Sequence, residues 1–135
     1  MKIKIDHINL TVTDIKTSIQ WYENLFGFRP VEHGFNQLGK PWVIVANDDS
    51  MIVMSEYNNR RPDDPSEDKS IHKIYHFGIR VSDQTEWLNR IEKHGLKIKY
   101  GGIVDYPHSK SWYVHDPSGH EIEVSYAGNK PLLFP

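Results

Sequence analysis

The stretch HINLTVTD at residues 7–14 decides the fold, because it returns 69 positions later as HFGIRVSD at residues 76–83. In both copies apolar residues alternate with other residues, which is the pattern of a strand with one buried face. A helical pattern follows each copy, and three short strand candidates follow each helix. The sequence therefore predicts two tandem copies of one β-α-β-β-β module.

The repeat also predicts the domain organisation. The chain, residues 1–135, fits a single domain with module one at 1–57 and module two at 71–127. Residues 58–70 are rich in Asn, Arg, Pro, Asp and Ser and are expected to link the modules, and residues 128–135 form a tail. The predicted fold class is α+β, in which each sheet has one face covered by its helix and one bare face. The bare faces must meet each other or a second chain, and we expect a homodimer.

The elements of each module can be placed from apolar spacing and turn residues. Apolar residues from Ile15 to Phe26 lie along one helical stripe, and a shorter stripe begins at Trp87. Asp83, with Glu86 three residues later, predicts a capping box at the start of the second helix. The strands expected after the helices are residues 28–33, 41–46 and 50–57 in module one and residues 97–102, 110–115 and 119–126 in module two.

Composition and charge narrow the possible partners. The chain is 38% apolar and 25% charged, as ordinary folded proteins are. Sixteen basic and eighteen acidic residues give a net charge of −2, which does not favour binding to nucleic acid or anionic lipid. The sequence contains no long apolar run and no signal-peptide pattern. We therefore expect a cytoplasmic protein with a small-molecule partner, no nucleic acid and no membrane.

The histidines indicate a metal site. Cysteine is absent, so such a site must use His, Asp and Glu. His7 and His76 are related by the 69-residue shift and point away from the apolar faces of their strands. Glu123 lies on the non-helix face of the last strand, and the same shift gives Met54 as its counterpart. Two imidazoles and one carboxylate suit Fe, Mn, Ni, Co or Zn and leave coordination positions open for substrate. Taken singly, such residues are usually solvated surface groups.

These residues resemble the vicinal oxygen chelate superfamily, which includes glyoxalase I, extradiol dioxygenases, and fosfomycin and bleomycin resistance proteins. The resemblance covers nearly the whole chain and rests on DHINL at residues 6–10, YHFGI at 75–79 and DPSGHEIE at 116–123. It implies a curved mixed sheet around a metal-binding cup, with the two histidines and the glutamate as ligands. It also implies a small substrate that chelates the metal through neighbouring oxygens.

The resemblance extends to residues around the substrate. Tyr113, ten residues before Glu123, matches a Tyr that extradiol dioxygenases and fosfomycin enzymes use near the substrate, so it is the candidate acid or hydrogen-bond donor. A Tyr with a core ring and a rim hydroxyl is the structural alternative. Glyoxalase I carries a fourth ligand where the repeat places Met54, and Glu56 is two residues further on the same face. Fosfomycin enzymes have Thr at the position of Asn9, which is a further candidate for the substrate pocket.

Two further side chains are candidates for the pocket wall. Arg80 shares the face of His76 and is expected either to pair with Glu121 or to bind an anionic substrate. Trp112, together with Trp42, is a candidate for stacking against an aromatic or drug-like ligand.

Three classes of function follow from these features. The first is a divalent-metal-dependent lyase, isomerase or ring-cleaving dioxygenase that binds neighbouring substrate oxygens. The second is an antibiotic-resistance protein of the fosfomycin-modifying or bleomycin-binding type, although bleomycin-binding relatives typically lack the ligand set. The third is a scaffold for protein contacts whose site has decayed. Metal binding separates the first class from a metal-free binding module.

Overall fold

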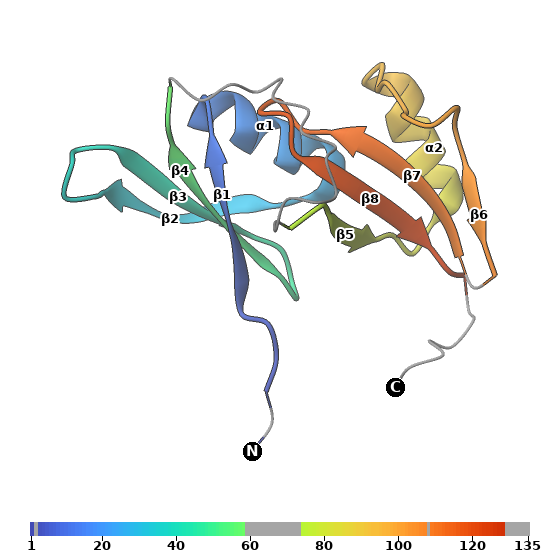
Figure 1. Ribbon diagram of the computed structural model, residues 1–135, viewed down its shortest axis with the longest axis horizontal. Helices are drawn as coiled ribbons and strands as arrows, with labels where there is room; N and C mark the ends of the chain where they lie inside the picture. The colour runs from blue at the N-terminus through green and yellow to red at the C-terminus, as the bar shows by residue number, and fades with distance from the viewer. Residues whose placement is uncertain (2, 59–73, 108, 129–135) are drawn as a thin grey trace. The chain divides into compact units, whose positions relative to one another are not determined.

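The structure, a computed structural model, describes residues 1, 3–58, 74–107 and 109–128. The chain divides into two compact units, which consist of Met1–Asp64 with Pro117–Gly119 and of Pro65–Asp116 with His120–Pro135. Among the described residues each unit contains one helix and one four-stranded sheet (Figure 1). Of the predicted linker and tail, only Asn58 and Gly128 lie within the described residues.

The first unit builds its sheet in the order β1-β4-β3-β2. Strand β1 is parallel to β4, and the other neighbouring pairs are antiparallel. Helix α1 packs against β2, β3 and β4. The elements are β1 (His7–Val12), α1 (Ile15–Phe26), β2 (Arg29–Phe35), β3 (Pro41–Ala46) and β4 (Met51–Glu56). The buried core consists of Leu10, Val12, Tyr22, Leu25, Phe28, Val43, Val45, Ile52 and Met54.

The second unit repeats this plan with the sheet order β5-β8-β7-β6. Strand β5 is parallel to β8, and the remaining pairs are antiparallel. The elements are β5 (Phe77–Arg80), α2 (Gln84–Lys93), β6 (Val104–Tyr106), β7 (Ser109–His115) and β8 (Glu121–Tyr126). The most deeply buried apolar side chains are Trp87, Trp112, Val114, Ile122 and Val124. The predicted pair of β-α-β-β-β modules is confirmed.

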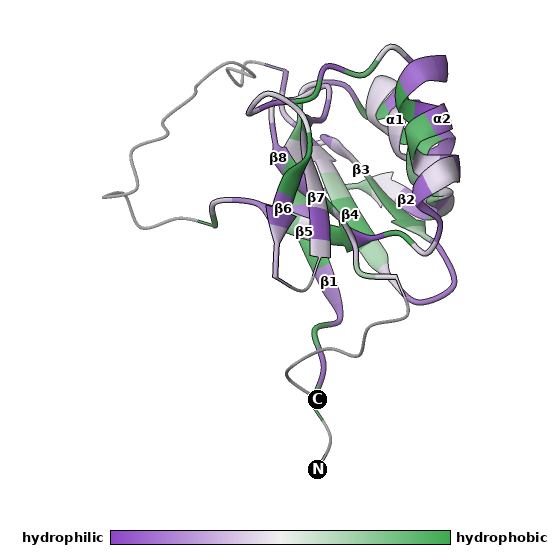
Figure 2. Cartoon of the chain, turned by 90° about the vertical axis from the view of Figure 1, so that its right-hand side faces the viewer, coloured by the Kyte–Doolittle hydropathy of each residue, from purple (hydrophilic) through white to green (hydrophobic). Residues whose placement is uncertain are grey.

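Both helices begin at an aspartate, and the start at Asp83 is the one that the sequence predicts. Asp14 accepts the backbone N–H of Thr17 at 2.7 Å, and Asp83 accepts that of Glu86 at 2.9 Å. The Glu86 carboxylate pairs with Arg90 one turn later, so the reciprocal half of the predicted capping box is not formed. In Figure 2 hydrophobic and hydrophilic residues alternate along both helices, as expected for helices with one buried face.

The cap at Asp83 predicts a measurable loss of stability. Asp83→Ala removes the acceptor for the Glu86 N–H and should lower the free energy of unfolding by about 1 kcal/mol in urea denaturation. Asp83→Asn keeps an acceptor and should change the stability little. Equal losses in the two variants would mean that the cap is not the source of the effect.

The strand predicted at residues 97–102 is wrong. Three consecutive residues there, Tyr100, Gly101 and Gly102, have φ angles of 56°, 78° and 117°, which a strand does not accommodate. The strand forms instead at β6, immediately after this turn. The segment remains attached to the sheet, because the Lys99 N–H donates to the Tyr113 carbonyl at 2.9 Å.

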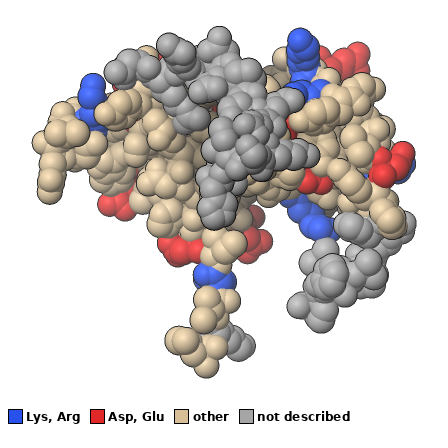
Figure 3. Space-filling model, viewed as in Figure 1, with Lys and Arg blue, Asp and Glu red and all other residues tan. Residues whose placement is uncertain are grey.

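Neither described helix has the length and apolar character needed to cross a membrane. On the face shown in Figure 3, Lys and Arg side chains are scattered and acidic side chains lie among them. This distribution agrees with the balanced composition and offers no continuous basic patch on that face.

Candidate functional site

The second sheet has a face turned away from the buried core, and polar residues gather on it. Along β8 the side chains alternate, so that Glu121 and Glu123 lie on this face. The register places both Tyr113 of β7 and Gly78 of β5 beside Glu123, and His76 precedes Gly78 by two residues. We call this surface the polar face, and it consists of His76, Gly78, Arg80, Ser111, Tyr113, Glu121, Glu123 and Ser125.

The imidazole of His76 and the carboxylate of Glu123 face each other on the polar face. His76 Nε2 is 3.1 Å from Glu123 Oε2. The hydroxyl of Ser111, which is fully buried, donates to the other carboxylate oxygen, Oε1, at 2.7 Å. Ser111 therefore holds the carboxylate with one oxygen turned toward the imidazole.

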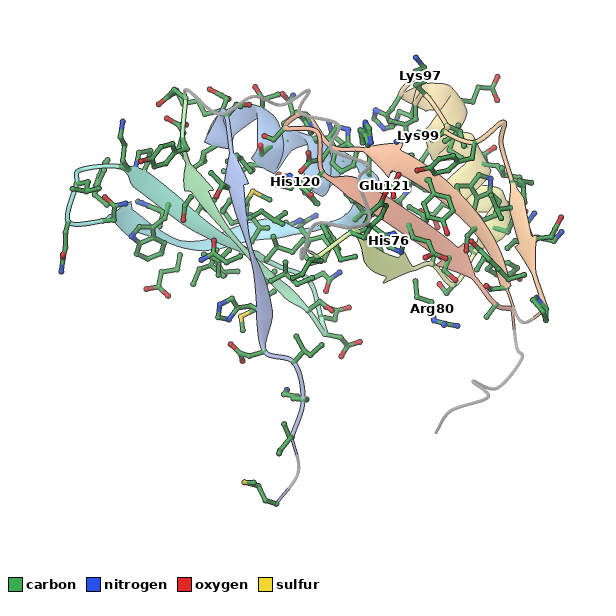
Figure 4. All side chains as sticks on the ribbon, viewed as in Figure 1. His76, Arg80, Lys97, Lys99, His120 and Glu121 are labelled. Atoms are coloured by element: carbon green, nitrogen blue, oxygen red, sulfur yellow. The ribbon has the colours of Figure 1, made fainter. Side chains whose placement is uncertain are left out.

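A second carboxylate, that of Glu121, lies at the other edge of the imidazole. Its Oε2 is 3.5 Å from His76 Nδ1, a separation that allows charge attraction but is long for a hydrogen bond. His76 Nδ1 is buried and has no hydrogen-bond partner within the described part of the chain. The Tyr100 hydroxyl and the Lys99 ammonium donate to Glu121 Oε1 at 2.5 and 3.2 Å. Figure 4 shows Lys99, Glu121 and His76 in succession on this sheet.

Lys99 and Tyr100 keep Glu121 in its charged form. Burial alone would raise the pKa of Glu121, but the hydrogen bonds from Tyr100 and Lys99 outweigh it and lower that pKa. The hydrogen bond to Glu121 raises the pKa of Tyr100. Burial opposes the charge on Lys99, yet contact with Glu121 raises the pKa of Lys99 overall. A carboxylate thus stands beside the imidazole at neutral pH.

Tyr113 packs against the imidazole of His76, and its hydroxyl is protonated. Its side chain is buried, its ring meets that of His76 edge-on at 5.6 Å between centroids, and its hydroxyl is 2.7 Å from that of Tyr106. Burial raises the pKa of Tyr113, and the hydrogen bond with Tyr106 and the charge of Glu123 raise it further. At neutral pH the group is a hydrogen-bond donor and not a phenolate.

The pair of His76 and Glu123 fits a divalent metal. Two ligand atoms at about 2.1 Å from one ion and at roughly right angles are about 3 Å apart, and His76 Nε2 and Glu123 Oε2 are 3.1 Å apart. Metal-bound histidines usually turn the second ring nitrogen toward a carboxylate or carbonyl, as His76 turns Nδ1 toward Glu121. Across the described residues no three His, Asp or Glu side chains are grouped closely enough to hold one ion. The structure brings together two of the three predicted ligands.

The predicted residues of β1 lie in the first unit. His7 is exposed, and its Nδ1 is 2.9 Å from Asp6 Oδ2. Asn9 is exposed two residues later on the same face. The role of His7 as the third ligand and that of Asn9 at the substrate stay predictions.

The predicted correspondence of Met54 with Glu123 is wrong. Strand β1 pairs Asn9 with Val53, whereas β5 pairs Gly78 with Glu123. Asn9 and Gly78 are related by 69 positions, but Val53 and Glu123 are related by 70. A slip of one residue moves a side chain to the other face of a strand. Met54 accordingly lies in the core at 0% exposure and cannot contact a substrate.

Two other predicted pocket residues also belong to the framework. Glu56 Oε2 accepts the backbone N–H of Ile15 at 3.0 Å, so this carboxylate serves the start of α1 and does not share the face of His7. Trp112 lies opposite Val124 on the buried face of its sheet and is 2% exposed. The predicted positions of both side chains at the substrate are therefore wrong.

Arg80 lies at the end of β5 and is exposed. The expected ion pair with Glu121 is not formed, because that carboxylate contacts Lys99, Tyr100 and His76. Arg80 instead lines a cleft of about 430 Å³ on the polar face. Figure 4 shows it farther along the sheet, on the side of His76 away from Glu121.

Sequence reasoning missed the residues that hold the two carboxylates. Ser111 could have been found, because it lies two residues before Tyr113 and so shares its face. Lys99 and Tyr100 carried no such signal, since they belong to an irregular turn and their partner Glu121 is 22 and 21 residues away.

Comparison with known proteins identifies the family. The family model of the Glyoxalase/Bleomycin resistance protein/Dioxygenase superfamily matches residues 4–124. The chain belongs to this superfamily. It is 28% identical over 129 residues to catechol-2,3-dioxygenase of Bacillus subtilis (strain 168), a match that covers 89% of this chain and 40% of that protein. The chain thus spans less than half the length of that relative.

Other members of the superfamily match over most of their length. The metallothiol transferase FosB of Staphylococcus epidermidis (strain ATCC 12228 / FDA PCI 1200) is 27% identical over 126 residues, which cover 89% of this chain and 79% of FosB. A crystal structure of a mutant of the fosfomycin resistance protein FosX from Listeria monocytogenes, complexed with Mn(II) and 1S,2S-dihydroxypropylphosphonic acid, aligns with a TM-score of 0.70 at 16% identity. The alignment covers 98% of this chain and 96% of FosX and shows a shared fold.

Proposed function

We propose that the protein is a divalent-metal-dependent enzyme that binds neighbouring oxygens of a small substrate. His76 and Glu123 are its ligands in the second unit, and His7 is the third ligand predicted from the repeat. The observation that carries the proposal is the 3.1 Å approach of His76 Nε2 to Glu123 Oε2, with Ser111 fixing the carboxylate from behind.

Several residues of the polar face have a role in the proposed chemistry. A bound divalent ion would supply a Lewis acid for the substrate oxygens. Ser111 holds Glu123, and Glu121 lies at the Nδ1 edge of the His76 imidazole. Tyr113, whose pKa is raised chiefly by its burial, keeps its proton and donates a hydrogen bond to a substrate oxygen.

Relatives support the metal and leave the reaction open. FosB is named a metallothiol transferase, FosX was crystallised with Mn(II), and the Bacillus relative is a dioxygenase. We propose Fe, Mn, Ni, Co or Zn as the ion, and a lyase, isomerase or ring-cleaving oxygenase reaction. A cytoplasmic location and a homodimer stay predictions.

The competing function, metal-free sequestration of an aromatic or drug-like ligand, has less support. It needs exposed aromatic surfaces for stacking, and Trp112, one of its two candidate side chains, is 2% exposed. Trp42 in β3 is partly exposed and could contact a ligand. One exposed ring of the pair does not provide the two surfaces between which a ligand would stack.

Metal binding tests the proposed function. Titration calorimetry with Mn²⁺ is expected to give one site in the wild-type chain and to lose most of its heat in His76→Ala. His94→Ala is the matched control, because it removes an imidazole at the end of α2, away from the strands of the polar face. His7→Ala should behave like His76→Ala. Equal Mn²⁺ binding by the wild type and His76→Ala, or none by either, would overturn the proposal.

A further inference from the structure

The cleft on the polar face is lined by one cationic and one anionic residue, Arg80 and Glu123. Its volume is about 430 Å³, and all of its lining residues belong to the second unit. Its lining includes Glu123, which the register pairs with Gly78, and Arg80, which lies two residues further along β5. The full lining is Gly78, Ile79, Arg80, Tyr106, Ser109, Glu123 and Ser125.

Arg80 is the cation of this cleft. It is exposed, and none of the ion pairs among the described residues involves it. The register places it beside Ser125 on the neighbouring strand, so that a hydroxyl accompanies the guanidinium. A guanidinium offers a planar fork of N–H donors that matches the oxygens of a carboxylate or phosphoryl group.

Gly78 keeps the space between His76 and Arg80 open. Its backbone is not in the left-handed region, and an added Cβ would meet only the Glu123 carbonyl oxygen at 3.8 Å, an ordinary contact. Neither conformation nor packing therefore requires glycine at this strand position. Glycine inside a strand marks a bulge, a tight bend or a close approach by a ligand or another backbone, and a side chain at this position would occupy part of the cleft.

Hydroxyl groups complete the wall. Ser109 and Tyr106 are register partners on β7 and β6, and both line the cleft. The Tyr106 hydroxyl also contacts that of Tyr113 at 2.7 Å, which links the cleft to the ring beside His76. One cation and several neutral hydroxyls suit an oxyanion.

We propose that the Arg80 end of this cleft binds the anionic group of the substrate, a carboxylate or a phosphonate-type oxyanion. This assignment rests on the proposed function, because it gives the Glu123 end to the metal and to the chelating oxygens. Gly78, beside Glu123, and Arg80 are two residues apart, which corresponds to about 7 Å along a strand. The substrate class is thus a small acid that carries an anionic group besides its metal-binding oxygens.

The test uses acetate and methylphosphonate as probes of the two anion types. Each is titrated into the full-length, metal-free chain in a chelating buffer, and the backbone amide signals of Gly78 and Ser125 are followed by NMR. Arg80→Gln is compared with Arg29→Gln, a matched control whose side chain is 78% exposed on the other unit. Arg80→Lys keeps the charge but loses the fork.

In the wild type, at least one of the two anions is expected to shift the amide signals of Gly78 and Ser125 until the site is saturated. The anion that binds with the higher affinity identifies the type of anionic group. Arg80→Gln should weaken that binding roughly tenfold or more, Arg80→Lys less, and Arg29→Gln not at all. Equal affinity in the wild type and Arg80→Gln, or no saturable shift with either anion, would overturn the assignment. Mn²⁺ titration of Arg80→Gln should match the wild type, so a failure of the anion site is distinguishable from a failure of the metal site.

Discussion

Replacing Trp112 by alanine is expected to lower the free energy of unfolding by about 3–5 kcal/mol. The indole is 2% exposed and lies across from Val124 on the buried face of its sheet. Its removal leaves a cavity that the surrounding side chains fill only in part. Because domains are typically stable by roughly 5–15 kcal/mol, urea denaturation followed by circular dichroism should show a much lower midpoint.

Trp42→Ala is the matched control for this prediction. Trp42 is partly exposed on β3 and covers Gly34, where an added Cβ would lie 2.7 Å from the indole ring. It should cost clearly less stability than Trp112→Ala, because more of its ring already faces water. Similar small losses in both variants would restore Trp112 as a candidate for ligand stacking.

The architecture was predictable because its signals are local and occur twice. The strand pattern at 7–14 and 76–83 and the aspartates at the helix starts, Asp14 and Asp83, each specify structure within a few residues. Because the same strand and helix patterns occur in the same order in both halves of the chain, each half independently predicts the same module. The family match over residues 4–124 confirms that reading.

The exact face of each strand residue was less predictable. The repeat of 69 holds between β1 and β5, but β4 and β8 are related by 70, as the pairs Asn9 with Val53 and Gly78 with Glu123 show. Side chains alternate with period two, so this single extra residue exchanged the core and open faces in the prediction for Met54. Glu123 was placed correctly on the open face because its own strand alternation was used and not the repeat.

The supporting contacts of the site were the least predictable part. Glu121 is held by Tyr100, a residue with φ of 56° in a turn within residues 97–102, where the sequence predicts a strand. Non-glycine residues rarely adopt this conformation, and no spacing rule joins such a turn to a strand 21 residues later. Tertiary contacts of irregular segments depend on the assembled sheet, which the sequence pattern does not specify.

A large loss of metal binding is also expected from Glu123→Gln. The change keeps the shape of the side chain but replaces the anionic oxygen that lies 3.1 Å from His76 Nε2 with a neutral amide. Ser111→Ala leaves the carboxylate in place and removes only the hydroxyl that donates to it at 2.7 Å. Loss of such an outer partner typically weakens metal binding roughly 10–100-fold, so Mn²⁺ titration should show a greater loss for Glu123→Gln.

Glu92→Gln, on the exposed side of α2, makes the same chemical change without touching the polar face and should bind Mn²⁺ as the wild type does. The order of the Mn²⁺ affinities therefore distinguishes a metal ligand, Glu123, from a residue that only holds the ligand in place, Ser111. The wild type and Glu92→Gln should bind most tightly, Ser111→Ala should be weaker, and Glu123→Gln weakest. If Ser111→Ala binds Mn²⁺ more weakly than Glu123→Gln, the carboxylate is not a ligand, and the approach of His76 to Glu123 is then a structural ion pair.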